Sequence, residues 1–149
     1  MMRVLITSDA FSPCAELAGF AVQRNKNAGA LASFVGYCRG DDAVDRLELE
    51  HYPGFTQAEV ARLAQAVAAR HGLIDLLVIH RVGVIPAGDP IVLVATLSRH
   101  RAAAFAAASE MMDYLKTDAP VWKREVGTQG ARWIEPTAED RARRQEHAE

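Results

Sequence analysis

Short apolar stretches separated by polar turns predict most of the secondary structure of this chain. Residues 44–51 alternate between apolar and polar side chains, with some slippage near Asp45, which is typical of a strand. Residues 29–39 are largely apolar, which predicts a buried strand. We expect these two strands to pair as an antiparallel hairpin through a turn at Gly40-Asp41-Asp42. Further strands are predicted at 3–7, 74–82, 91–98, 121–126 and 132–135.

Two long helices are predicted from helical periodicity and from helix-forming composition. The clearer helix begins at Thr56, which fits a capping box with Glu59 three residues later, and Gly72 provides a C-terminal stop. The second is rich in alanine and runs from about Arg99 to Thr117. The apolar stripe of the first helix consists of Val60, Leu63, Ala64, Val67 and Ala68.

A short helix at 13–23 and a highly charged segment at 138–149 complete the predicted elements. The charged segment is typical of a solvated helix or a frayed, flexible tail. Strands joined both by hairpins and by helices favour an α+β domain over a doubly wound sheet. Because no internal repeat or linker divides the 149 residues, we expect a single domain over 1–149 with a charged tail at 137–149.

Composition narrows the classes of function. The net charge of −2 gives no support for a general nucleic-acid binder, so any cationic site must be local. The two cysteines, Cys14 and Cys38, lack metal-type spacing, which favours a reduced, cytoplasmic protein. No apolar run approaches the roughly 18 residues of a membrane helix, and the N-terminus lacks the features of a signal peptide.

Basic residues gather in the segment between Ser98 and Glu125. Arg101 and Lys116 lie at opposite ends of the alanine-rich helix, and Lys123 follows a proline break. At a rise of about 1.5 Å per residue, Arg101 and Lys116 are about 22 Å apart along the helix axis. They cannot both serve one small substrate within a single subunit. If both are functional, one of them comes from a second copy of the chain across a dimer interface. The alternative is an amphipathic helix with charged ends.

Lys116 is the candidate for covalent chemistry, because burial or nearby cations can lower the pKa of a lysine. Lys123 and Arg124 are the cations near it in sequence. The alternative is an exposed lysine that complements the helix dipole. Arg39 ends a buried strand before a glycine turn, where a guanidinium can bind phosphate, although an ordinary surface arginine fits equally well.

Other motifs of catalysis are missing from the sequence. His51 and His80 end strands and are interpreted as structural. The sequence has no His, Cys, Asp and Glu cluster with metal-ligand spacing, no glycine-rich phosphate loop and no serine nucleophile elbow. The residues alone therefore predict an anion-binding α+β domain in which a lysine is the candidate for chemistry.

Seven blocks of sequence add a resemblance to a known family. In collinear order over about Gly29 to Glu135, they resemble the large, catalytic subunit of molybdopterin synthase. The blocks are Gly29–Gly36 with Arg39, Leu49–Gly54, His80–Gly83, Gly88-Asp89, His100–Phe105, Met112–Lys116 and Pro120–Glu125.

The resemblance implies a sulfurtransferase of molybdenum cofactor biosynthesis with an α/β-hammerhead fold, which agrees with the α+β prediction. In that family a small ubiquitin-like subunit carries a C-terminal thiocarboxylate, and its tail enters a pocket of the large subunit. Sulfur is transferred to cyclic pyranopterin monophosphate to form molybdopterin. The large subunits form a central homodimer with one small subunit at each end. The transfer itself requires no metal or organic cofactor.

The resemblance also assigns site residues. Lys116 and Lys123 match the two catalytic lysines of the family, with Lys116 closest to the thiocarboxylate and Lys123 in an acid–base or electrostatic role. Arg39, His100 and Arg101 match residues that line the anionic substrate pocket, to which both subunits contribute. This agrees with the helix-length argument for Arg101 and Lys116.

The chain departs from the family beside Arg39. The family commonly has Gly-Lys-Val-Arg where this sequence has Gly36-Tyr37-Cys38-Arg39, so a basic residue is missing there. This departure leaves open a non-catalytic member that only binds an ubiquitin-like tail or a phosphorylated ligand. A phosphate-ester hydrolase is a third hypothesis, disfavoured because neither a metal cluster nor a nucleophile–base pair is evident.

Overall fold

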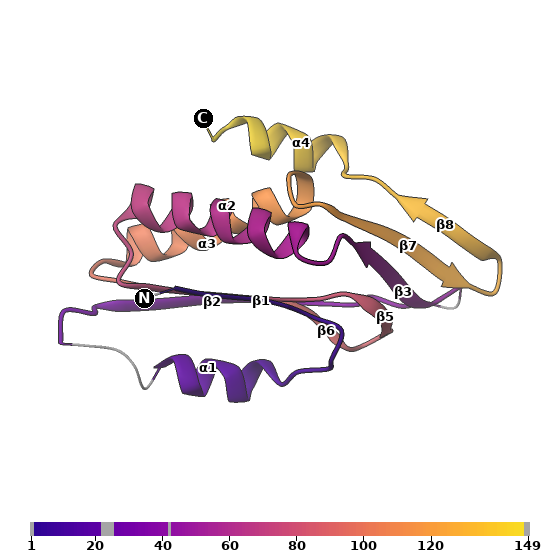
Figure 1. Cartoon of the computed structure of the whole chain (residues 1–149), viewed down its shortest axis with the longest axis horizontal. Helices are drawn as coiled ribbons and strands as arrows, with labels where there is room; N and C mark the ends of the chain where they lie inside the picture. Colours follow the sequence, from indigo (N-terminus) through magenta and orange to yellow (C-terminus); the bar gives the residue numbers. More distant parts are fainter. Residues whose placement is uncertain (1, 22–25, 42, 148–149) are drawn as a thin grey trace.

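The computed structural model describes residues 2–21, 26–41 and 43–147 as two four-stranded sheets with four helices packed around them (Figure 1). The elements are β1 (Met2–Thr7), α1 (Pro13–Ala21), β2 (Ala30–Tyr37), β3 (Val44–His51), α2 (Phe55–His71), β4 (Asp75–Arg81), β5 (Gly83–Pro86), β6 (Pro90–Ser98), α3 (Arg101–Thr117), β7 (Val121–Gly127), β8 (Gly130–Ile134) and α4 (Ala138–Gln145). In the part of the chain that is described, no helix combines the length and the apolar character needed to cross a bilayer.

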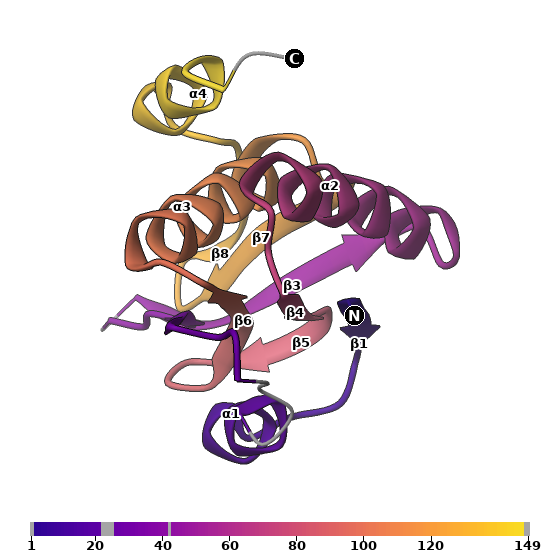
Figure 2. The same ribbon diagram turned by 90° about the vertical axis from the view of Figure 1, so that its left-hand side faces the viewer.

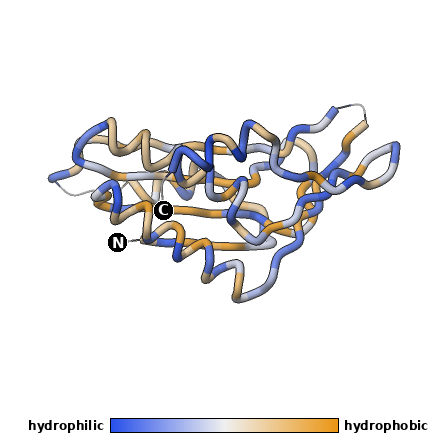
Figure 3. Tube along the Cα trace, turned by 90° about the horizontal axis from the view of Figure 1, so that it is seen from above, coloured by the Kyte–Doolittle hydropathy of each residue, from blue (hydrophilic) through white to orange (hydrophobic). Residues whose placement is uncertain are grey.

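The first sheet has the strand order β1-β4-β6-β2, in which only the pair β1–β4 is parallel. Helices α2 and α3 cover one face of this sheet and α1 covers the opposite face (Figures 1 and 2). Alternate residues of β4 therefore enter two cores: Val78 packs toward α2 and α3, whereas Ile79 packs against Phe20 of α1. Figure 3 shows the apolar segments running along these central strands.

The second sheet has the order β5-β3-β7-β8 and is antiparallel throughout. A small core of Cys38, Leu49, Val82 and Ile85 packs where the two sheets meet. Helix α4 packs beside α3 (Figures 1 and 2). The two sheets and the C-terminal end of α3 thus converge on one region, which holds the candidate site described below.

The predicted hairpin between β2 and β3 is wrong. β2 pairs with β6, while β3 pairs with β5 and β7 in the second sheet. The chemistry of the 40–42 turn permits a local hairpin, but the largely apolar β2 gains more by pairing with the buried β6. The prediction that this strand is buried is also wrong, because β2 is the edge strand of its sheet and Ala32 is the one residue within it that is buried. The sequence prediction also missed β5, which is only four residues long.

The predicted capping box at Thr56 is also wrong. Helix α2 begins at Phe55, and Gly54 stands at its N-cap position with φ 82°. Thr56 is fully buried: its hydroxyl accepts a hydrogen bond from the Tyr52 N–H at 3.0 Å and donates one to the Pro120 carbonyl at 2.9 Å. Thr56 therefore joins the start of α2 to the segment that leads into β7.

Other features of α2 are confirmed. Gly72 ends the helix in the left-handed conformation, with φ 60° and ψ 42°. Four members of the predicted stripe are buried, and Ala68 packs against them as a partly buried residue.

The charged C-terminal segment forms helix α4, which is largely exposed and contacts α3 through a few side chains. Thr137 caps it, accepting a hydrogen bond from the Asp140 N–H at 3.0 Å. The Arg144 guanidinium lies 4.8 Å from the Tyr114 ring centroid and donates to Asp118 of the α3–β7 turn at 2.8 Å. His147 contacts Asp113 of α3 at 2.6 Å. At the start of α4, Asp140 lies close enough to Lys116 to be affected by its charge.

Candidate active site

A pocket of about 690 Å³ lies where the end of α3, the start of β7 and the end of β8 come together. Three of the predicted site residues, Arg39, Lys116 and Lys123, line it. Its other lining residues are Tyr37, Leu47, Ile91, Leu115, Thr117, Asp118, Ala119, Pro120, Val121, Trp122, Glu125, Ile134, Glu135, Pro136, Thr137 and Asp140. Four carboxylates share this lining, and two of them, Asp118 and Glu125, form ion pairs with Arg144 and Arg132. A negatively charged ligand is therefore expected beside the three cations and not across the whole pocket.

Each cation comes from a different element. Arg39 follows β2 and is exposed. Lys116 is exposed in the last turn of α3. Lys123 lies in the middle of β7, opposite Leu49 of β3 and Ile134 of β8, and is partly buried. The two lysines thus stand on either side of the turn that joins α3 to β7.

The perturbed amine of the site is Lys123. Burial, the larger cause, and the charge of nearby Lys116 together lower the pKa of Lys123 to about 8. The expectation that Arg124 supplies a cation to this site is wrong, because alternation along β7 turns it away. Arg124 forms an ion pair with Glu48 and lies 5.3 Å from the Trp133 ring centroid.

Removing the charge of Lys116 is expected to raise the pKa of Lys123. In Lys116→Ala the pKa should rise above about 8 but stay below 10.5, since burial, the larger cause, remains. Lys116→Arg keeps the charge and should leave the value near 8. NMR titration of the lysine side chains measures this directly, and the loop residue Lys26 serves as an internal reference. An unchanged Lys123 titration in Lys116→Ala would contradict the coupling.

Beneath the two lysines, His80 is a buried neutral imidazole. Its Nδ1 lies 2.8 Å from the Arg81 carbonyl, which can only accept, so Nδ1 carries the proton. Burial lowers the pKa of His80 to about 4, and the charges of Lys123 and Lys116 act in the same direction. The interpretation of His80 as structural is consistent with this burial.

His80 should make the protein less stable in mild acid. Its pKa is about 4 in the folded protein and 6.5 once the imidazole is exposed to water, so its contribution is complete above pH 6.5 and is lost as the pH falls toward 4. The loss amounts to about 3 kcal/mol. We expect His80→Gln, whose amide can still donate to the Arg81 carbonyl, to flatten this decline in urea unfolding followed by tryptophan fluorescence. Parallel curves for the two proteins between pH 6.5 and 4 would exclude His80 as the cause.

Sequence analysis missed Asp140, a carboxylate in the wall of the pocket. Burial would raise the pKa of Asp140, but hydrogen bonds from Thr137 and the charges of Lys116 and Lys123 outweigh it and hold the pKa below its usual range. Asp140 is therefore a counter-ion of the two lysines. The spacing Thr137-x-x-Asp140 was the available signal, because it predicts a helix N-terminus within the charged tail.

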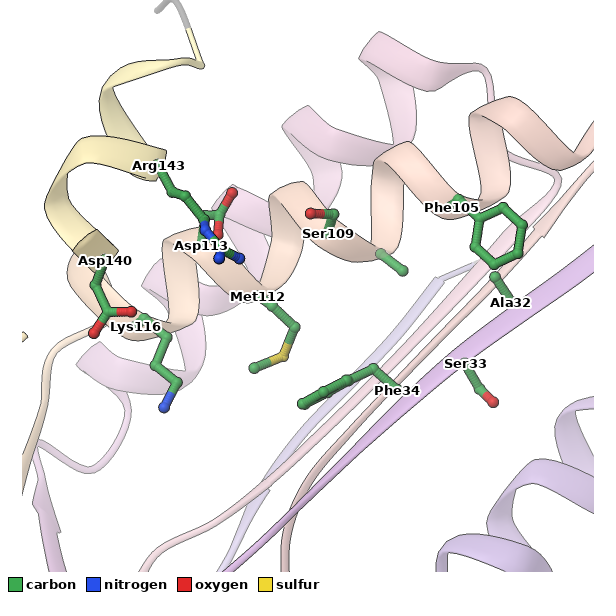
Figure 4. A pocket seen from close by; sticks show the side chains of 11 residues that line it. Ala32, Ser33, Phe34, Phe105, Ser109, Met112, Asp113, Lys116, Asp140 and Arg143 are labelled. Atoms are coloured by element: carbon green, nitrogen blue, oxygen red, sulfur yellow. The ribbon is translucent and has the colours of Figure 1, made fainter. Parts of the chain in front are cut away.

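His100 and Arg101 are not brought to this pocket. His100 stands at the N-cap position of α3 and Arg101 opens the helix, so they lie about 24 Å and about 22 Å from Lys116 along the helix axis. A second hollow, of about 370 Å³, runs along α3 between these ends (Figure 4). Figure 4 shows Phe34 of β2 and Phe105 and Met112 of α3 around it, with Lys116 at one end.

Comparison with known proteins places the chain in a family. The model of the MoaE protein family matches residues 6–118. The chain belongs to the MoaE family. The relatives described next, which are named molybdopterin synthase catalytic subunits, confirm the family resemblance found in the sequence.

MoaE relatives match the chain over nearly its whole length. It is 48% identical over 141 residues to the molybdopterin synthase catalytic subunit of Caulobacter vibrioides, with 94% of this chain and 93% of the relative covered. The corresponding protein of Cereibacter sphaeroides is 45% identical, with 95% and 97% covered. The solved structure of the molybdopterin biosynthesis MoaE protein from Burkholderia ambifaria is 41% identical, with a TM-score of 0.82 and full coverage of both chains. This likeness confirms the predicted α+β class.

Proposed function

We propose that this protein is the catalytic subunit of molybdopterin synthase and transfers sulfur from the C-terminal thiocarboxylate of a small ubiquitin-like carrier to cyclic pyranopterin monophosphate. The observation that carries the proposal is that Lys116, Lys123 and Arg39 line one pocket. The pocket must bind a negatively charged group of each reactant: the thiocarboxylate of the carrier and the phosphate of the pterin. The names of the relatives, which are molybdopterin synthase catalytic subunits, support the same activity.

The two lysines have different tasks in this proposal. The thiocarboxylate sulfur bonds to a carbon of the pterin in place of an oxygen that leaves as water. Water then attacks the resulting thioester, cleaves its bond to the carrier and leaves a carboxylate, so negative charge develops on the carbonyl oxygen in that step. Lys123, with a pKa of about 8, is mostly protonated at pH 7 and can stabilise that charge or donate a proton. The exposed Lys116 meets the incoming tail at the open side of the pocket. Arg39 binds the phosphate of the pterin.

Two interfaces are part of the proposal. The carrier tail enters the pocket, and a second copy of this chain brings His100 and Arg101 to it. The exposed apolar side chains of Leu31, Phe34 and Phe105 on β2 and α3, 38%, 44% and 67% exposed, support contact between copies there. The proposed location is the cytoplasm. The free thiols of both cysteines suit that reducing compartment.

Reconstitution tests the proposed function. The purified protein is mixed with the thiocarboxylated carrier and cyclic pyranopterin monophosphate, and molybdopterin is measured by mass spectrometry. Two thiocarboxylates should be consumed for each dithiolene formed, because each carrier delivers one sulfur. Binding of the carrier without any product would contradict the proposal and favour a non-catalytic binding module, the alternative left open by Tyr37.

A further inference from the structure

The turn between β5 and β6 fixes the backbone immediately before Arg39. The Cys38 N–H donates to the Asp89 carbonyl at 2.8 Å, and the Cys38 carbonyl accepts from the Gly88 N–H at 2.7 Å. The Cys38 side chain is buried, with Sγ 3.5 Å from the Ile85 carbonyl. Cys38 is thus held by the turn through its main chain and by β5 through its side chain.

The chain immediately after Arg39 meets the same turn. A Cβ built on Gly40 would lie 2.4 Å from the Cβ of Ala87, a distance that real side chains do not adopt. Only glycine therefore allows the two segments to approach this closely. The Ala87 N–H also donates to the Asp45 carbonyl at 2.9 Å. Arg39 thus stands between two residues that both pack on the turn.

An ion pair anchors the turn to the central strand β4. Arg81 ends β4 and is 9% exposed, and its Nη1 donates to Asp89 Oδ2 at 3.0 Å. Its Nη2 donates to the Val84 carbonyl of β5 at 3.3 Å. Removing the partner of a buried guanidinium is costly, so this contact holds the turn firmly.

We propose that Arg81 and Asp89 form a positioning pair that holds Arg39 in the pocket for the phosphate of the substrate. The inference rests on the proposed function, because it acts through the role given to Arg39. Of the described residues that line the pocket, Arg39 is one, whereas Arg81 and Asp89 are not. A small displacement of Arg39 would strongly weaken its binding of the phosphate. Loss of the Arg81–Asp89 pair therefore lowers the affinity for the ligand although neither residue contacts it.

Hydrogen exchange of the free protein provides the first test. Asp89→Asn removes the charge while keeping the shape, and we expect the Cys38 amide to exchange about tenfold faster as the turn opens more often. The matched control is Glu59→Gln, which breaks the exposed pair with Arg62 on α2 and should leave Cys38 unchanged. An unaltered Cys38 amide in Asp89→Asn would overturn the inference.

A double-mutant cycle provides the second test, with calorimetric Kd values for cyclic pyranopterin monophosphate. Asp89→Asn should weaken binding about fivefold in the wild-type background and less than about twofold when Arg39 is already alanine. Arg81→Lys, which keeps the charge, should lose less than Arg81→Met. Equal losses from Asp89→Asn in both backgrounds would show that the pair does not act through Arg39.

The two proposals fail in different ways. If Arg39→Ala weakens binding and Asp89→Asn does not, only the positioning role is wrong. If Arg39→Ala binds the pterin as tightly as the wild type, the role of Arg39 in the proposed function is wrong, and the positioning role is wrong with it.

Discussion

Replacement of Lys116 by alanine is expected to lower the rate of molybdopterin formation by at least about 100-fold. Lys116 is an exposed residue of the pocket lining, across the α3–β7 turn from Lys123, so in the proposed mechanism its loss removes one of the two amines that act on the thiocarboxylate. The fold should be unaffected, because an exposed residue in the last helical turn contributes little to stability. Single-turnover sulfur transfer with the thiocarboxylated carrier measures the effect.

Two control variants make the result specific. Lys26→Ala removes an exposed lysine of a loop and should keep full activity. Lys116→Arg keeps the positive charge but cannot act as a free amine at neutral pH, so it separates charge from amine chemistry. Activity near the wild-type level in Lys116→Arg would limit Lys116 to electrostatics, and unimpaired Lys116→Ala would remove it from the mechanism.

The local elements of the fold could be predicted because their signals are local. The stripe from Val60 to Val67 defines α2, and Gly72 ends it in the conformation that glycine favours. Strand pairing could not be predicted in the same way. β2 has an acceptable turn after it, yet its partner is β6, more than 50 residues away, and the apolar β2 lies as a mostly exposed edge strand beside the buried β6. Such pairing is decided by the whole core and not by a turn.

The candidate site shows a similar division. The length of the predicted helix was enough to show that Arg101 and Lys116 are far apart, and the structure confirms that they lie at opposite ends of α3. The residues alone singled out Lys116, Lys123 and Arg39 as candidates, and the family resemblance gave each of them a role. The burial of Lys123 could not be read from the sequence, because it depends on β7 lying between β3 and β8. Asp140 was missed because a charged tail carries no signal of where its helix will pack.

A mixture of two inactive variants is expected to regain activity if the pocket is shared between subunits. Lys116→Ala and Arg101→Ala should each be strongly impaired alone. In a dimer with one copy of each, one site combines both alanines, whereas the second site combines an intact Lys116 with an intact Arg101 from the partner. After random exchange of subunits, half of the dimers are mixed and one site in each is intact, so activity should reach about one quarter of the wild-type value.

The controls for this experiment follow from the same geometry. Lys116→Ala mixed with Lys123→Ala should regain nothing, because both lysines line the pocket of a single chain and every site of the mixed dimer lacks one of them. Lys116→Ala mixed with Arg39→Ala should also stay inactive for that reason. If Arg101 acted within its own chain, its mixture with Lys116→Ala would behave like these two. The distance of about 22 Å along α3 excludes that arrangement for a substrate of pterin size, which is why recovery is the expected result.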